Sequence, residues 1–157
     1  MKIRILKIVV IAISIVMTSA CSSDDNNDSN NNSANQVADA SQVAQSGTWR
    51  ISKFIDSGTD ETSDFAGYEF SFNSDGTLVA TKNNSTVNGT WSVTSSSSSS
   101  SSSGDIDFNI SFAVNPDSDF DDLIDDWDVV EITNSKIELT DVSGGNGGTD
   151  FLTFTKI

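Results

Sequence analysis

From Thr48 to Ile157, apolar residues alternate with polar residues, and short clusters of Gly, Asn, Asp and Ser interrupt the alternation. Alternation with a period of two is typical of antiparallel strands that bury one face. The clearest run is 106–112, in which every second side chain is Ile or Phe. The pattern predicts eight strands, at 48–55, 67–72, 77–82, 90–93, 106–112, 129–133, 136–140 and 151–156.

Short turns join these strands into hairpins. Asn73-Ser74-Asp75-Gly76 ends in a glycine that can adopt positive φ, and Asn134-Ser135 is a second tight turn. Eight antiparallel strands in hairpin order can close into a barrel, which removes exposed edges. We therefore expect an all-β fold, an eight-stranded antiparallel meander barrel over residues 47–157, with a two-sheet sandwich as the alternative. The side chains expected inside are Trp49, Ile51, Tyr68, Phe70, Phe72, Trp91, Val93, Phe108, Ile110, Leu139, Leu152 and Phe154.

One segment, 117–127, departs from the strand pattern. Its apolar residues are Phe120, Leu123, Ile124 and Trp127, at the spacing that lines one face of a helix. The Asp residues at its start suit the positive end of a helix. The segment therefore predicts one short amphipathic helix, lying over the barrel or closing one end of it.

The N-terminus has the order of charges typical of a secreted protein. A basic start is followed by the apolar run 8–17 and the small residues Thr18, Ser19 and Ala20 before Cys21. This order predicts a signal peptide over 1–20, because the apolar run is shorter than the roughly 20 residues of a spanning helix. The four residues 18–21 resemble a lipobox, and the resemblance implies cleavage before Cys21 and lipid attachment to it. The membrane would then be a partner through that lipid.

The residues after Cys21 are polar and acidic. Ser22, Ser23, Asp24 and Asp25 resemble the surface-export signal of Bacteroidota lipoproteins, which implies an outer-membrane protein that faces the cell surface. The alternative is that they only begin a polar linker. Residues 21–46 as a whole predict a lipidated Cys followed by a disordered tether, with room for a short helix near Val37, Ala38 and Val43. The serine tract 95–103 predicts a mobile loop between strands.

Charge and composition exclude several functions. The chain has 8 Lys+Arg, 23 Asp+Glu, no His and one Cys. Such an acidic chain repels nucleic acid, and without His the usual zinc, copper and haem ligands and the Ser-His-Asp and Cys-His catalytic sets are missing. Glycosidases use a pair of carboxylates, but in so acidic a chain such pairs are expected by chance. The sequence therefore predicts no cofactor and no enzymatic activity.

An acidic run gives a weak candidate for calcium. Asp117, Asp119, Asp121 and Asp125 have nearly the spacing of a calcium loop, whose ligands are oxygens. Asp122 stands where such a loop needs glycine. A solvated acidic face is therefore the favoured interpretation, with no metal bound.

Several short motifs occur in an order that is similar to lipocalin-like domain lipoproteins of the Bacteroidota type. They are Gly47-Thr48-Trp49, the hairpin 72–77, Gly89-Thr90-Trp91, 127–130 and 152–154. The resemblance implies an eight-stranded barrel with Trp49 packed at its closed end.

Two functions remain open for such a domain. In the first, the barrel mouth binds a small apolar or sugar-like ligand through Trp49, Tyr68, Phe70, Trp91 and Phe108. In the second, the barrel core is solid, and the domain is a non-enzymatic structural or interaction module that meets a protein or polysaccharide.

Overall fold

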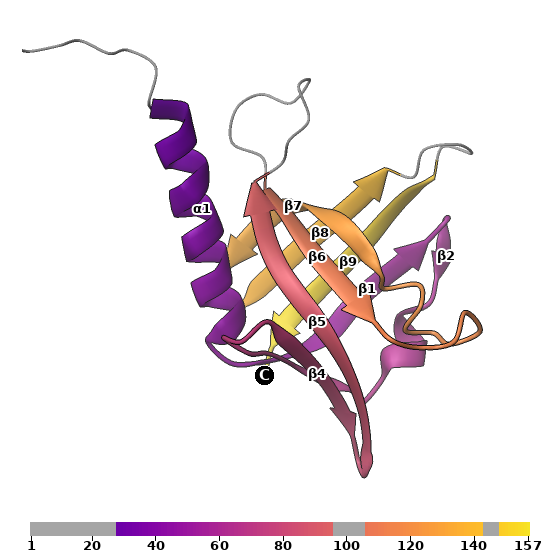
Figure 1. The fold of residues 1–157 in the computed structure, drawn as a ribbon. Coiled ribbons are helices and arrows are strands. Elements are labelled where there is room, and N and C mark those ends of the chain that lie inside the picture. Colours follow the sequence, from indigo (N-terminus) through magenta and orange to yellow (C-terminus); the bar gives the residue numbers. More distant parts are fainter. Residues whose placement is uncertain (1–27, 96–105, 143–147) are drawn as a thin grey trace, which may run out of the picture.

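The structure is a computed structural model that describes residues 28–95, 106–142 and 148–157 (Figure 1). The predictions made for the signal peptide, for Cys21 and for the four residues after it lie outside the described residues. So does the serine tract, except for its first residue. Among the described residues, no helix is long and apolar enough to cross a membrane.

The described chain is mostly antiparallel sheet. Consecutive strands pair with one another, and the last strand pairs back with the first, so that the sheet closes into a barrel of eight strands. A two-residue strand, β2, adds to the end of β1 outside this ring. The predicted eight-stranded meander barrel is therefore confirmed. The strands are β1 Thr48–Asp56, β2 Thr59–Asp60, β3 Glu69–Phe72, β4 Thr77–Lys82, β5 Ser85–Ser95, β6 Ile106–Phe112, β7 Asp125–Thr133, β8 Lys136–Val142 and β9 Thr149–Lys156.

The β3–β4 hairpin forms for the reason that its sequence predicts. Gly76 has φ of +83°, and the Asn73 N–H donates to the Thr77 carbonyl at 2.9 Å. The Trp91 indole N–H donates to the Asn73 carbonyl at 3.0 Å and so ties the turn to β5. Gly89 beside it has to be glycine, because a Cβ there would overlap the Ser111 carbonyl oxygen and the Phe112 ring.

Aromatic side chains fill the barrel interior. Phe72 packs edge-on against Trp91, Phe108 and Phe154, with ring centroids 5.3–5.4 Å apart. Edge-to-face contacts at such distances are the favoured geometry for aromatic pairs. The predicted inward-facing residues are all buried, except that Tyr68 is half-buried. The barrel therefore has a solid core.

One end of the barrel is covered by a helix, α1 Asp28–Gln45 (Figure 1). The prediction of a disordered tether is wrong for these residues. Ala40 and Ala44, one helical turn apart, are buried against the barrel, and the Trp49 indole N–H donates to the Ala44 carbonyl at 2.8 Å. The segment is rich in Asn and Ser, which are poor helix formers, so its helix depends on this packing. We call this side the helix end.

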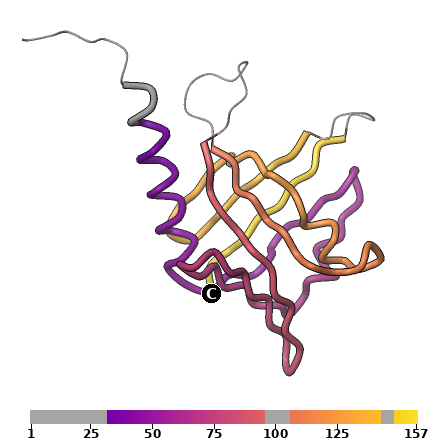
Figure 2. The backbone as a smooth tube through the Cα atoms, viewed as in Figure 1, coloured from indigo at the N-terminus to yellow at the C-terminus, as the bar shows by residue number. Residues whose placement is uncertain are grey.

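Residues 113–124 cover the opposite end, which we call the loop end (Figure 2). The predicted helix over 117–127 is wrong: the segment forms successive turns, and β7 begins at Asp125. Phe120, Leu123 and Trp127 are nevertheless buried as expected. Asp and Ser side chains compete for backbone hydrogen bonds and favour turns over a helix interior. The 3₁₀ helix η1 Thr62–Phe65 packs beside these turns, where Phe65 and Phe120 meet at 5.5 Å.

Candidate functional site

The barrel interior leaves its predicted ligand-binding residues inaccessible. Trp49, Phe70 and Phe108 have no exposed surface, and Trp91 is 7% exposed. Trp91 stacks on Phe108 at 5.6 Å, inside the aromatic cluster described above. Tyr68 is the exception, because it lines a groove in the barrel wall. The candidate site is therefore on the wall of the barrel rather than within it.

This groove exists because β1 and β3 separate soon after they meet. They pair only at Thr48–Ser71 and Trp49–Phe70. The next contact of β1 on that side is at Phe54, whose N–H donates to the Thr62 hydroxyl at 2.8 Å. Between these two points, β1 pairs with β9 on one side and borders the groove on the other. We call this feature the wall groove.

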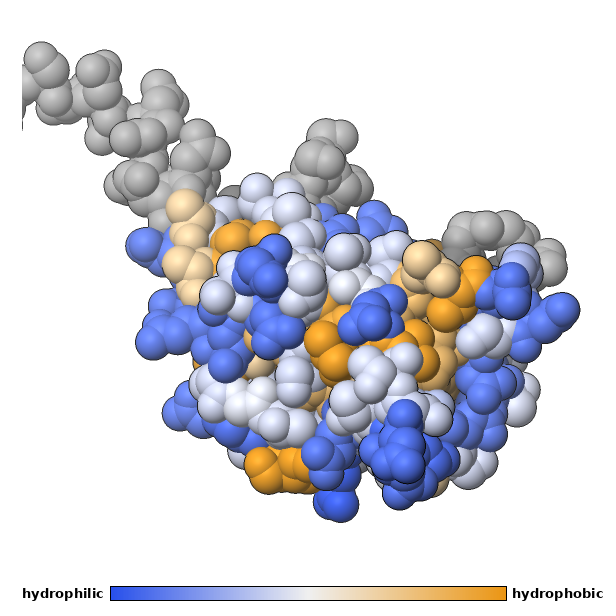
Figure 3. All heavy atoms as spheres, turned by 60° about the horizontal axis from the view of Figure 1, so that its bottom comes forward, coloured by the Kyte–Doolittle hydropathy of each residue, from blue (hydrophilic) through white to orange (hydrophobic). Residues whose placement is uncertain are grey.

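The wall groove has a volume of about 890 Å³ and a mixed lining. The C terminus lies at the bottom of Figure 1, the side that comes forward in Figure 3, and there hydrophobic residues reach the surface between hydrophilic ones. Apolar groups form part of the lining, and hydroxyls, carboxylates and a guanidinium form the rest. The apolar residues are Ile51, Phe65, Ala66, Tyr68 and Ile157, the polar residues are Arg50, Ser52, Asp60, Thr62, Ser63 and Glu69, and Gly67 completes the lining.

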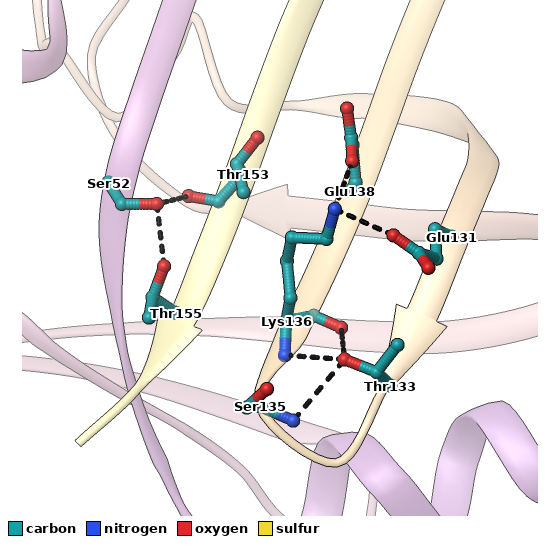
Figure 4. A network of polar contacts seen from close by, with 8 residues as sticks. All are labelled: Ser52, Glu131, Thr133, Ser135, Lys136, Glu138, Thr153 and Thr155. Carbon is teal, nitrogen blue, oxygen red and sulfur yellow. Dashed lines mark hydrogen bonds and ion pairs between the residues drawn. The ribbon is translucent and has the colours of Figure 1, made fainter.

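Hydrogen bonds fix the two sides of the wall groove. The Thr155 hydroxyl donates to the Ser52 hydroxyl at 2.7 Å, and this pair ties β1 to β9 beside its irregular step between Ile51 and Lys53 (Figure 4). On the other side, the Thr62 backbone N–H donates to Asp60 at 3.1 Å. The Thr62 hydroxyl and this N–H hold the pKa of Asp60 below its usual value. Asp60 is therefore a carboxylate at neutral pH.

Two cations of the described residues, Lys136 and Arg50, differ in their contacts. Lys136 bridges Glu131 and Glu138, with both N–O distances at 2.6 Å (Figure 4). These contacts raise the pKa of Lys136 and lower that of Glu138. Both ion pairs found among the described residues belong to Lys136, so the exposed Arg50 guanidinium at the wall groove is available to a ligand.

The calcium candidates do not form a ligand set. Asp117, Asp119 and Asp121 lie in the turns of the loop end, and Asp125 begins β7. Among the described residues, no group of three or more acidic side chains has the geometry to hold a metal ion. Burial raises the pKa of Asp125 to about 6.

Two further carboxyl groups, Asp122 and Glu61, have raised pKa values. Burial raises the pKa of Asp122 and of Glu61, and the negative charge of Asp56, at the end of β1, raises both further. Asp122, in the loop end, and Glu61 therefore lie near other carboxylates that repel them.

Sequence reasoning missed most of the wall groove. Arg50 and Ser52 are the outward residues of a strand, and outward polar residues have the same pattern whether they face water or a ligand. Thr62 and Ser63 lie in a connection that had no predicted structure. The signal that brings them together is the early separation of β1 from β3, which is a property of pairing register and is not visible in one sequence.

Comparison with known proteins adds little to this geometry. No protein-family model and no curated relative matches the chain. Among solved structures, it is similar to a DUF4847 family protein from Bacteroides vulgatus, with 16% sequence identity and a TM-score of 0.44. The similarity covers 73% of this chain and 94% of that one. At this level the function has to be argued from the site itself.

Proposed function

We propose that the chain is a non-enzymatic binding module that takes a sugar-like ligand in the wall groove. We further propose that the lipid on Cys21 anchors it to the outer membrane, facing the cell surface, and that it is a lipocalin-like lipoprotein of the Bacteroidota type. The mixed lining of the wall groove is the observation that carries the binding role. The solid core supports an external site over one in the barrel mouth.

The lining suits a saccharide better than a purely apolar molecule. The volume of the wall groove lies within the range of small-molecule sites, which bind through apolar walls and a few convergent polar groups. Hydroxyls and carboxylates can hydrogen-bond to sugar hydroxyl groups, while the half-buried Tyr68 and the exposed Ile157 offer apolar surface to the C–H face of a ring. Arg50 adds five N–H donors, which also match the carboxylate of an acidic sugar.

The chemistry of the groove supports binding without catalysis. Glycoside hydrolysis needs one carboxyl group that is protonated at working pH and can act as the acid. Of the two carboxyl groups that line the groove, Asp60 and Glu69, Asp60 is held ionised by its contacts with Thr62, so it cannot donate a proton at neutral pH. The chain also has no His to serve as a general base near pH 7.

The proposed anchor would hold the domain close to the membrane. Only residues 22–27 separate Cys21 from the first residue of α1. An extended chain spans at most about 3.5 Å per residue, so the helix would begin within roughly 25 Å of the lipid. Labelling cells with an alkynyl fatty acid tests the anchor: the complete chain should incorporate the label, and Cys21→Ser should not. Equal labelling of both would contradict the lipid site.

Saccharide binding is tested with the full chain in mild detergent. Titration calorimetry would use galacturonate trimer, maltotriose and N,N′-diacetylchitobiose as probes. We expect saturable binding of at least one probe, weakened about tenfold by Arg50→Ala, because a hydrogen bond to a charged group is worth about 1.5–3 kcal/mol.

The matched control is Lys53→Ala, an exposed cation on the same strand that does not line the groove. It should leave affinity within twofold. If none of the probes released heat, or if both variants lost the same amount of affinity, binding in the wall groove would be contradicted.

A further inference from the structure

Two side chains of opposite charge stand at the point where β1 and β3 separate. Arg50 of β1 and Glu69 of β3 both line the wall groove. The β1–β3 ladder ends at the pair Trp49–Phe70, one position short of the pair that Arg50 and Glu69 would make. Every residue from 48 to 95 is described, and no ion pair joins these two side chains. The groove therefore offers a guanidinium on its β1 side and a carboxylate on its β3 side.

A second cation stands at the border of the same groove. Lys82 of β4 is half-buried, and its Nζ atom lies over the Tyr68 ring, 5.1 Å from the ring centroid. Its aliphatic chain runs beside Gly67, where an added Cβ would lie 3.5 Å from the Lys82 Cε atom. Gly67 and Tyr68 both line the groove, so this ammonium is held next to it. Like Arg50, Lys82 makes no ion pair within the described residues.

This placement runs against the charge of the whole chain. The chain has 8 Lys+Arg against 23 Asp+Glu, so a cation without a carboxylate partner is the exception. The described residues contain few cations, and two of them border this one groove. They are Arg50, Lys53, Lys82, Lys136 and Lys156. Charges farther away than about 8 Å are largely screened at physiological salt, so a bound anion responds mainly to the groups around the groove.

The carboxylates of the lining suit hydroxyl groups. Asp60, near the opposite end of the groove, accepts a hydrogen bond from the Thr62 backbone N–H at 3.1 Å. The exposed Glu69 carboxylate makes no ion pair among the described residues. Both can accept hydrogen bonds from hydroxyl groups. Charged donors and carboxylate acceptors thus stand at different places, which fits a ligand with a carboxylate on one edge and hydroxyl groups on another.

We infer that the ligand of the wall groove is a uronate, a sugar that carries a carboxylate on its ring, and this inference rests on the proposed function. Arg50 binds the carboxylate through two parallel N–H donors, the geometry in which a guanidinium matches that group. Lys82 adds positive charge at the border, and Glu69 accepts hydrogen bonds from ring hydroxyl groups. A neutral sugar of the same shape leaves Arg50 without a charged partner, so Arg50 is the residue that sets specificity.

Titration calorimetry on the full chain in mild detergent compares uronates with neutral sugars of the same linkage. The matched pairs are galacturonate trimer with galactose trimer, and mannuronate trimer with mannose trimer. We expect one uronate to bind about tenfold more tightly than its neutral counterpart, because hydrogen bonds between charged groups are stronger than those to a neutral group. Raising the salt concentration from about 0.05 M to about 0.5 M should reduce this preference, since salt screens exposed charges.

Variants of the cations assign the preference to residues. Arg50→Gln removes the charge and should reduce the preference to about twofold or less, whereas Arg50→Lys keeps the charge, loses the paired donors and should retain about threefold. Lys82→Gln should weaken uronate binding about twofold, as expected for a partly exposed charge. The matched control is Lys53→Gln, which removes the same charge at an exposed position outside the lining and should leave the preference unchanged.

The outcomes separate this inference from the proposed function. Equal affinity for each uronate and its neutral counterpart, binding of neutral sugars alone, or a preference that survives Arg50→Gln would overturn the inference and leave saccharide binding intact. If neither these sugars nor maltotriose and N,N′-diacetylchitobiose bound, saccharide binding itself would be contradicted, and the inference would fail with it.

Discussion

The two ends of the barrel are closed by different means. At the helix end, α1 packs through the buried Ala40 and Ala44, the half-buried Val37 and Val43, and one indole hydrogen bond. At the loop end, irregular turns place Phe120 and Leu123 deep in the core. The regular helix thus fully buries only small side chains, whereas the irregular turns bury large ones. Regularity of the backbone is therefore a poor guide to how firmly a segment is held.

Burial of side chains explains this difference. Fully burying a Phe or Leu side chain contributes about 1.5–3 kcal/mol, whereas an Ala methyl contributes far less. Phe120 also meets the rings of Phe112 and Tyr68, both at 5.0 Å. We therefore expect the loop end to unfold with the barrel, and α1 to open locally at lower free energy.

The largest expected effect comes from Phe120→Ala. Removing a ring that is 5% exposed leaves a cavity among several aromatic neighbours, so the free energy of unfolding should fall by about 3–5 kcal/mol. Val43→Ala is the matched change at the helix end, where the side chain is half-buried, and it should cost about 1 kcal/mol. Urea denaturation of both variants measures the two values. Similar losses would mean that the two ends are held equally well.

A smaller effect is expected from Trp49→Phe, which tests the helix end directly. The Ala44 carbonyl lies at the last turn of α1 and is buried, so loss of the indole N–H leaves it unpaired. We expect a loss of about 2 kcal/mol and faster hydrogen exchange across α1.

The control for this prediction is Trp91→Phe. It breaks a similar indole bond, from Trp91 to the Asn73 carbonyl of the β3–β4 hairpin, and leaves the bond from Trp49 to α1 in place. It should destabilise the barrel without accelerating exchange in α1. Faster exchange in α1 for both variants would show that the helix opens only with the barrel.

These ends also show what the sequence could and could not predict. Strand alternation located all eight barrel strands, because burial on one face imposes a period of two on each of them. Over 117–127, the spacing of apolar residues correctly predicted that Phe120, Leu123 and Trp127 are buried. It did not predict the backbone conformation, since consecutive turns can bury the same residues as a helix.

At the helix end, by contrast, the sequence pattern did not predict α1. The segment 28–45 is poor in large apolar residues, and its two buried side chains are alanines, which are equally common in linkers. Only the barrel surface that receives them makes the segment helical. The wall groove was missed similarly, because it arises where β1 and β3 separate, and pairing register depends on the whole closed sheet.

The smallest expected effect is on pH dependence, and it belongs to the loop end. Burial raises the pKa of Asp125 to about 6, although the Asp126 N–H donates to its carboxylate at 2.8 Å. A carboxyl group whose pKa is raised on folding binds its proton more tightly in the folded chain. Its stabilising contribution is therefore complete below its unfolded pKa, near 3.8, and is lost as pH rises through 6. Glu61 and Asp122 act in the same direction.

The melting temperature should accordingly rise by about 3–5 °C between pH 7.5 and pH 5, which corresponds to about 1 kcal/mol after allowance for solvent screening of a half-buried group. Asp125→Asn should melt at a higher temperature than the unaltered chain at pH 7.5 and lose most of this rise. Asp126→Asn changes the exposed neighbour and should keep most of it. Below pH 4 the trend should reverse, since Asp60 and Glu138 have lowered pKa values and lose their favourable contacts on protonation. A melting temperature that instead falls steadily from pH 7.5 to pH 5 would show that the carboxylates of the loop end are solvated, and that this end is packed less tightly than its buried rings indicate.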